Sequence, residues 1–219
     1  MAIIILGLCG LLVWTPQLVY WKFLTGNWFY FSYGEDAKFF FLNPHITDAL
    51  FSYRKGWFIY TPIMLFAVLG LYTTLKSYKK QFLPIALFLV ANIYVVFSWW
   101  NWWYGGGFGQ RALIESYAFL AFPLTAIINE GLKRRRQLKI ATIGLCILFT
   151  AHGFFQNLQY YYGAIHWDSM TKEAYWLQFG RLKKHPLQSK YLVRLDYTKA
   201  RKGIYVPESV EKPQIQDML

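Results

Sequence analysis

The sequence predicts an all-α integral membrane protein with about five transmembrane helices, aromatic outer loops and a polar C-terminal tail. Three observations support this fold class. Of the 219 residues, 56% are hydrophobic and only 16% are charged. The apolar residues come in blocks close to the roughly twenty residues that cross a bilayer as a helix. Lysine and arginine are concentrated in short connections between these blocks.

The expected spans, in chain order, cover residues 2–20, 57–75, 82–99, 112–129 and 140–155. The first begins without a basic leader and without a small-residue cleavage site. We therefore expect it to stay in the bilayer rather than to be removed as a signal peptide. Pro62, Pro84 and Pro123 fall within later spans, where each can kink a helix whose neighbours satisfy the freed carbonyl.

Two connections between spans are strongly basic and set the expected orientation. They contain Lys76, Lys79 and Lys80 in one case, and Lys133, Arg134, Arg135, Arg136 and Lys139 in the other. Such connections favour the cytoplasmic side. The loops 21–56 and 100–111 and the tail after residue 156 then face outward. A change of composition near residue 163 divides a transmembrane region, 1–163, from an extracytoplasmic polar tail, 164–219.

The first outer loop and the tail also carry weaker signals. Because aromatic residues crowd the first half of the loop 21–56, we expect this loop to lie against the membrane surface, with a short helix at 47–53. The tail favours an amphipathic helix at 169–184 and two short paired strands at 191–195 and 204–206.

The net charge of +12 is divided between the basic connections and the tail. It shows no basic stripe with a folded module behind it, which argues against a nucleic-acid partner and favours anionic membrane lipids. Cys9 and Cys146 both lie in spans and are expected to pack there rather than to pair.

Residues 99–111, which read WWNWWYGGGFGQR, link the third and fourth spans. The tryptophans are expected to anchor the chain where lipid meets water and, in second place, to offer a stacking surface for sugar rings. The four glycines allow consecutive amide groups to surround phosphate oxygens. Arg111 follows them at the start of the fourth span, where cation and helix N-terminus together favour an anion.

Arg54 and Lys55 precede the second span in the same manner. Cations at two outward-facing helix ends predict a phosphate-binding site. Two alternatives stay open. The glycines can serve only a re-entrant turn while Arg111 pairs with Glu115, and the first two cations can contact lipid headgroups without specificity.

Three acids share the first outer loop with a histidine: Glu35, Asp36, Asp48 and His45. A carboxylate beside aromatic rings can deprotonate a sugar hydroxyl, although solvated loop acids are far more common. No recognised spacing of metal ligands occurs, so we expect neither a metal nor a cofactor. His152, inside the fifth span, is expected to form a hydrogen bond to a neighbouring helix.

Two motifs resemble those of bacterial polytopic glycosyltransferases of the GT-C type, which use polyprenyl-phosphate sugars and include the family 39 and mannosyltransferase-like enzymes. The first motif runs from Trp102 through Tyr104, the glycines and Phe108 to Arg111. The second comprises Phe51, Ser52, Arg54, Lys55, Gly56, Trp57, Tyr60, Thr61 and Pro62. Together with their surroundings they cover about a third of the chain.

This resemblance implies an inverting enzyme of the bacterial inner membrane that transfers a sugar from a polyprenyl phosphate to a lipid, glycan or protein. Arg111 would contact the donor phosphate, and Tyr104 and Gln110 would line that pocket. Arg54 and Lys55 would steady the same group or the acceptor. The family's catalytic carboxylate lies before both motifs, so the chain is expected to match the C-terminal part of such an enzyme, with its catalytic residue unknown and an upstream polypeptide as partner.

Two other functions compete with this one. The alternative is a non-enzymatic membrane subunit or anchor that recognises anionic lipids. A transporter of lipid-linked sugars ranks last, because only Asn92, Glu115 and His152 interrupt the spans with polar groups.

Overall fold

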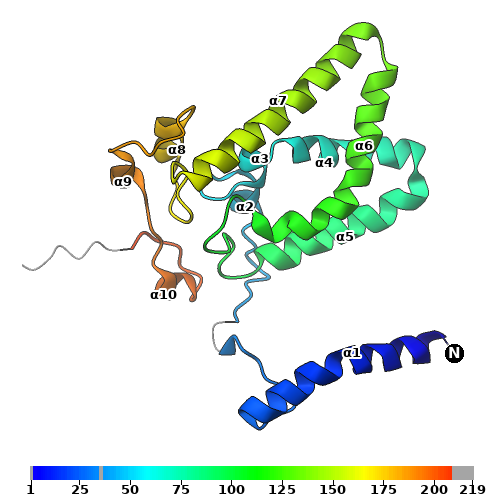
Figure 1. The fold of residues 1–219 in the computed structure, drawn as a ribbon, viewed down its shortest axis with the longest axis vertical. Coiled ribbons are helices and arrows are strands. Elements are labelled where there is room, and N and C mark those ends of the chain that lie inside the picture. The colour runs from blue at the N-terminus through cyan, green and yellow to red at the C-terminus, as the bar shows by residue number, and fades with distance from the viewer. Residues whose placement is uncertain (1, 35–36, 209–219) are drawn as a thin grey trace, which may run out of the picture. The chain divides into compact units, whose positions relative to one another are not determined.

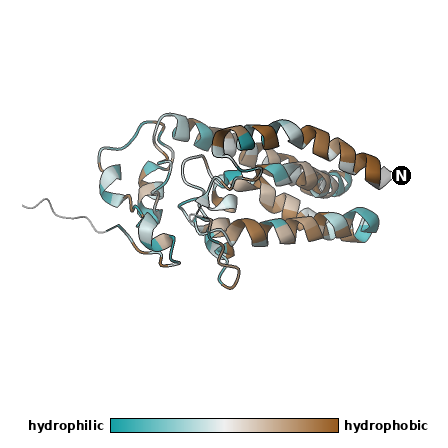
Figure 2. Ribbon diagram, turned by 90° about the horizontal axis from the view of Figure 1, so that it is seen from below, coloured by the Kyte–Doolittle hydropathy of each residue, from teal (hydrophilic) through white to brown (hydrophobic). Residues whose placement is uncertain are grey.

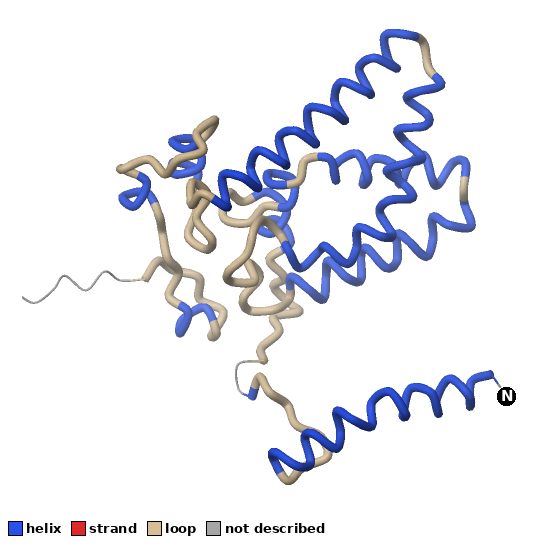
Figure 3. Tube along the Cα trace, viewed as in Figure 1, coloured by secondary structure: helices blue, strands red, loops and turns tan. Residues whose placement is uncertain are grey.

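A computed structural model describes residues 2–34 and 37–208 of the chain (Figure 1). It divides into two compact units, Met1–Ala37 and Lys38–Leu219, which are described separately. Within the described residues, helices and loops account for the whole trace (Figure 3).

The first unit is dominated by α1, Ala2–Thr25. This helix covers the first expected span, continues five residues beyond it, and is long and apolar enough to cross a membrane. It ends where Gly26 adopts a φ of 76°, and the Lys22 ammonium donates to the Gly26 carbonyl oxygen at 2.6 Å. A cation is favourable at this end because the last carbonyls of a helix carry partial negative charge. None of the apolar stretch Ile4–Thr25 is buried in the chain, so its surface is compatible with lipid contact.

The second unit contains the remaining helices. They are α2 (Ile46–Phe51), α3 (Trp57–Tyr60), α4 (Ile63–Ser77), α5 (Lys79–Phe97), the 3₁₀ helix η2 (Arg111–Ser116), α6 (Tyr117–Lys133), α7 (Arg136–Tyr161), α8 (Lys172–Gln178), α9 (Gln188–Tyr191) and α10 (Tyr197–Ala200). Expected spans three to five correspond to α5, to η2 with α6, and to α7. The short helix expected at 47–53 is α2.

Among the described residues, four helices are long and apolar enough to cross a membrane: α1, α5, the continuous η2–α6 segment and α7. The expected continuous span at 57–75 is wrong. It is broken at Thr61, whose backbone leaves the helical region at φ −139° and ψ 64°. The break has a local cause, because Pro62 lacks an amide proton and disfavours helical geometry in the residue before it. The count of five spans is therefore not confirmed.

Small residues set how closely the long helices approach one another. A Cβ atom on Gly70 of α4 would lie 2.0 Å from the carbonyl oxygen of Pro123 in α6, so only glycine fits there. On α6, a Cβ atom on Gly131 would lie 2.3 Å from the Thr142 hydroxyl of α7. Helices in membranes commonly approach through such small residues.

Three segments of the second unit, 38–56, 98–110 and 162–208, contact one another at one end of these helices. The His45 amide donates to the Phe97 carbonyl at 2.9 Å, and the Lys55 ammonium donates to the Trp167 carbonyl at 2.7 Å. The two basic connections are the hairpins α4–α5 and α6–α7, at the other end of the helices (Figure 1). Hydrophobic residues cover the long helices, and hydrophilic residues gather in the C-terminal segment (Figure 2).

The tryptophans of the 99–111 segment are mostly not an interfacial anchor, which corrects that expectation. Trp100, Trp102 and Trp103 are buried, with at most 5% of each residue exposed. They pack with Phe97 and Leu113 in the main core, below the contacting loops. Their number suggests a lipid-facing belt, but a core beneath contacting loops also requires large apolar side chains.

The tail folds differently from the expectation at two points. The amphipathic helix expected at 169–184 is shorter, and only α8 is helical there. The expected strands do not form among the described residues. The two segments are joined instead by a single antiparallel bridge between Leu195 and Pro207. The expected boundary at residue 163 falls two residues after the end of α7.

Candidate functional site

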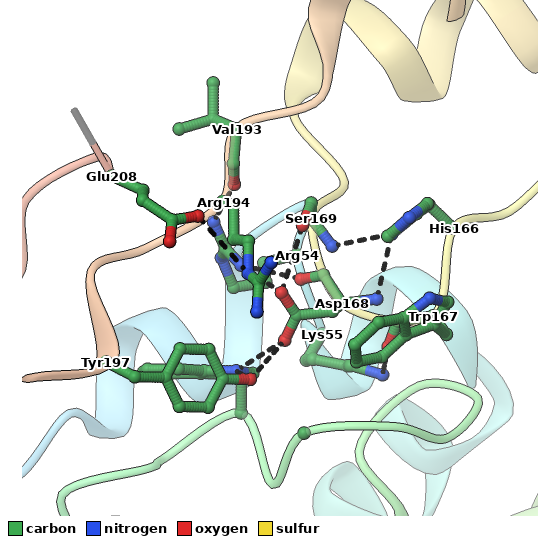
Figure 4. A network of polar contacts seen from close by, with 12 residues as sticks. Arg54, Lys55, His166, Trp167, Asp168, Ser169, Val193, Arg194, Tyr197 and Glu208 are labelled. Carbon is green, nitrogen blue, oxygen red and sulfur yellow. Dashed lines mark hydrogen bonds and ion pairs between the residues drawn. The ribbon is translucent and has the colours of Figure 1, made fainter. Parts of the chain in front are cut away.

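A buried carboxylate organises the contacting loops (Figure 4). Asp168 is 1% exposed. Its Oδ1 accepts hydrogen bonds from the Trp103 indole at 2.8 Å and from the Tyr197 hydroxyl at 2.9 Å. Its Oδ2 accepts from the Ser169 hydroxyl at 3.0 Å and lies 3.6 Å from Nη1 of Arg54. A buried carboxylate is stable only with such partners.

Arg54 joins the segment before α3 to the tail. Its Nη1 donates to the Asp168 carbonyl oxygen at 2.6 Å, and its Nη2 donates to the Val193 carbonyl oxygen at 2.5 Å. The guanidinium carbon also lies 5.7 Å from the centre of the Trp103 ring. Burial lowers the pKa of Arg54, while the negative charge of Asp168 acts in the opposite direction. Both terminal nitrogens of the Arg54 guanidinium therefore have partners within the chain.

Lys55 joins the same segment to two others. Its Nζ donates to the carbonyl oxygens of Gly107 and Trp167, and the residue is only 2% exposed. Burial lowers its pKa to about 8. The Asp168 carboxylate partly offsets this effect, whereas the nearby charges of Arg111 and Arg54 add to it.

His166 shapes the turn that presents Asp168. Its Nδ1 accepts hydrogen bonds from the backbone amides of Asp168 and Ser169, at 3.1 and 3.0 Å. A ring nitrogen that accepts hydrogen bonds from two amide groups carries no proton itself. Burial lowers the pKa of His166, which favours this neutral form.

Arg111 is a cation of this region whose charge is not matched by any described carboxylate. It is exposed and begins η2. Among the described residues it forms no hydrogen bond or ion pair, so the alternative pairing with Glu115 does not occur. Gly107 lies between Arg111 and Lys55. A Cβ atom on Gly107 would lie 2.9 Å from Cδ of Arg111, and the Gly107 carbonyl oxygen accepts a hydrogen bond from the Lys55 ammonium.

A cavity of about 250 Å³ lies beside this cation, between the end of α3, the glycine loop, η2–α6 and α7. We call it the Arg111 cavity. Its lining comprises Tyr60, Thr61, Phe108, Gln110, Arg111, Ile114, Tyr117, Gly153 and Asn157. In this described set there is one cation and no carboxylate. The arrangement can hold an anion with an attached polar group.

The structure brings some of the predicted residues to this cavity and not others. Gln110 lines it, is 3% exposed and donates from Nε2 to the Trp102 carbonyl at 3.4 Å. Its Oε1 has no hydrogen-bond partner among the described residues. Tyr104 does not line it, because its hydroxyl donates to the Val96 carbonyl at 2.8 Å. Arg54 and Lys55 do not line the cavity; they belong to the polar contacts around Asp168 and Trp167.

The predicted acids are dispersed. Asp48 lies 3.0 Å from Nδ1 of His45 and faces a different cavity, described below. Glu35 and Asp36 fall outside the described residues. His152 lines an apolar cavity of about 350 Å³ between α3, α7 and α8, and no hydrogen bond to a neighbouring helix is present among the described residues.

Comparison of the chain with protein-family models, with curated proteins and with solved structures finds no match. The resemblance to GT-C glycosyltransferases therefore stays a prediction, which rests on the two motifs alone.

Asp168 is the residue that sequence reasoning missed. It lies in a tail that contains many cations and several other acids, so its charge alone does not distinguish it. The available signal is its place in the stretch His166, Trp167, Asp168 and Ser169, where an acid lies between an aromatic residue and a serine.

The buried Lys55 ammonium predicts a pH dependence of stability. In the folded chain its pKa is about 8, against an ordinary value of 10.5. Between these values the unfolded chain holds more protons, so the free energy of unfolding rises with pH. The difference in unfolding free energy between wild type and Lys55→Met should increase by at most about 1.4 kcal/mol per pH unit there. Denaturant unfolding below and above this range measures it, and an unchanged difference would contradict the assignment.

Proposed function

We propose that this chain binds the phosphate of a polyprenyl-phosphate sugar at Arg111, as part of a membrane glycosyltransferase that acts on the outer face of a bacterial inner membrane. The observation that carries the proposal is the unmatched charge of Arg111 beside a cavity that opens between helices. The sugar would pass to a lipid, glycan or protein acceptor. The carboxylate that activates the acceptor would come from an upstream polypeptide.

The charge balance of the region supports an anionic ligand. The charges of Arg54 and Arg111 both lower the pKa of Lys55. The Asp168 carboxylate acts in the opposite direction on the pKa values of Arg54 and Lys55. Three cations against one carboxylate leave an excess of two positive charges. A phosphate placed beside Arg111 would reduce this excess, and Lys55 and Arg54 would contribute to its binding at a distance rather than by contact.

The shape of the site supports a lipid-borne ligand. The Arg111 cavity joins a polar end, formed by the side chains of Arg111, Gln110 and Thr61, to apolar residues such as Phe108 and Ile114. A ligand with a charged headgroup and a hydrocarbon chain needs both kinds of surface. Gln110 Oε1 is buried and has no partner in the part of the chain that the structure describes, so it can accept a hydrogen bond from a hydroxyl of the attached sugar.

Arg111→Ala tests the proposal. The full chain, in nanodiscs of phosphatidylcholine, is titrated with undecaprenyl phosphate, and binding is followed by tryptophan fluorescence. Removing a charge-assisted contact to phosphate should weaken binding by about tenfold to a hundredfold. Undecaprenol, which lacks the phosphate, should bind equally weakly to wild type and variant.

Arg136→Ala is the matched control, because Arg136 is likewise an exposed arginine at the first position of a helix, α7, but at the opposite end of the helices. It should leave the affinity unchanged. If both variants weakened binding equally, the site at Arg111 would be refuted.

That outcome would favour the second candidate function, an anchor or subunit that recognises anionic lipids. The exposed cations of the hairpins α4–α5 and α6–α7 specifically support it, since Lys79, Lys80, Arg135 and Arg136 have no ion pair among the described residues.

A further inference from the structure

A second cavity, of about 480 Å³, lies among α2, the tryptophan loop, the start of α8 and the C-terminal segment. We call it the Asp48 cavity. It shares no lining residue with the Arg111 cavity. Its volume falls within the range of roughly 300–1,000 Å³ typical of small-molecule sites. Segments distant in sequence build it, so it is a product of the folded unit rather than of one loop.

The acidic side of this cavity is held in a defined position. Oδ2 of Asp48 lies 3.0 Å from Nδ1 of His45, and the Asp48 side chain is 54% exposed. The His45 ring in turn lies against Trp102 and Tyr205, with centroid distances of 5.9 and 4.2 Å. The second carboxylate oxygen of Asp48 has no hydrogen-bond partner among the described residues. It is therefore available to a ligand.

Two cations, Arg54 and Lys172, and aromatic rings also line the cavity. Lys172 is exposed and forms no hydrogen bond or ion pair with a described residue. The Tyr205 hydroxyl donates to the Trp100 carbonyl at 2.8 Å, which fixes its ring at the cavity. Ser52 adds a hydroxyl group.

We propose that the Asp48 cavity binds an uncharged hexose ring. A carboxylate accepts hydrogen bonds from neighbouring sugar hydroxyls, an ammonium donates to their oxygens, and an aromatic ring packs on the C–H face of the sugar. Arg54 also lines the cavity, but it is held by Asp168 and the Val193 carbonyl. Asp48 and Lys172 are therefore the charges left to a ligand, and Asp48 would repel a strongly anionic one. The Asp48 cavity thus differs in ligand chemistry from the Arg111 cavity, and the inference does not depend on the proposed phosphate site.

Saturation-transfer NMR on the full chain in phosphatidylcholine nanodiscs tests this inference, with the methyl glycosides of mannose, glucose and galactose as probes. At least one glycoside should receive saturation on its ring protons. Asp48→Asn and Lys172→Gln should each lower the affinity for that glycoside by about tenfold, through the loss of charge-assisted hydrogen bonds. Because Lys172 is exposed and unpaired among the described residues, its variant does not endanger the fold.

Two controls separate this site from its surroundings. Glu173→Gln, which changes a neighbouring carboxylate outside the cavity lining, should bind as wild type does. Arg111→Ala should also bind the glycoside normally, so a failure of the phosphate proposal would not affect this result. Absence of saturation transfer from all three glycosides at millimolar concentration, or equal affinities for wild type, Asp48→Asn and Lys172→Gln, would overturn the inference.

Discussion

Asp168→Ala is expected to lower the free energy of unfolding by about 3–5 kcal/mol. The substitution leaves the Arg54 guanidinium buried without its counter-charge and removes the acceptor of the Trp103 indole and the Tyr197 hydroxyl. Since these donors come from separate segments, the loss should also release the tail from the helices. Equilibrium unfolding in mixed micelles measures the first effect, and faster amide hydrogen exchange across residues 164–208 reports the second.

The control for this prediction is a carboxylate in an exposed ion pair. Glu208 pairs with Arg194 at 3.4 Å, and both side chains are more than half exposed. Glu208→Gln should change the free energy of unfolding by less than about 1 kcal/mol. A similar small effect of Asp168→Ala would show that the buried network does not hold the tail.

Gly70→Ala is expected to destabilise the helices by about 2–3 kcal/mol. The added methyl group would meet the Pro123 carbonyl oxygen at 2.0 Å and carbon at 2.6 Å, and backbone atoms cannot turn aside as a flexible side chain can. Therefore α4 must move away from α6 along their contact. Unfolding in mixed micelles of increasing dodecyl sulfate content measures the loss.

Gly144→Ala supplies the comparison within α7. No atom lies within 4 Å of a Cβ built on Gly144, so the substitution meets no obstacle. Alanine also has a higher helix propensity than glycine, by about 1 kcal/mol, so this variant should be neutral or more stable. Equal destabilisation by both variants would contradict the close approach of α4 and α6.

The positions of the long helices were predictable because each requires only a local run of apolar residues. The break at Thr61 was not predicted, although Pro62 was noted within the span. A proline in a membrane helix can either kink or end it, and which occurs depends on the packing of the flanking residues. Here Trp57 and Tyr60 are each only 1% exposed, in cores formed with other segments. These contacts hold α3 apart from α4.

The cations of the candidate site were predicted as a group, but their different surroundings were not. Arg54 and Lys55 look like Arg111 in sequence, since each precedes an apolar stretch. The difference comes from Asp168, which is 114 residues from Arg54 along the chain. Burial by so distant a segment leaves no local pattern. The burial of the tryptophans was missed for the same reason. Tyr197 of the tail contacts Trp100 and Trp103, and Tyr205 contacts Trp103.

The short length of α4 has a consequence for a surrounding bilayer. Its 15 residues rise about 22 Å, whereas the hydrocarbon core is about 30 Å thick. If α4 lies across a bilayer together with the four longer helices, the bilayer beside it must be thinner to match it. Such thinning would occur on the helix that follows Thr61, a residue of the Arg111 cavity. It would bring the lipid headgroups beside α4 closer to the Arg111 cavity. The path from a headgroup to the Arg111 guanidinium would then be shorter.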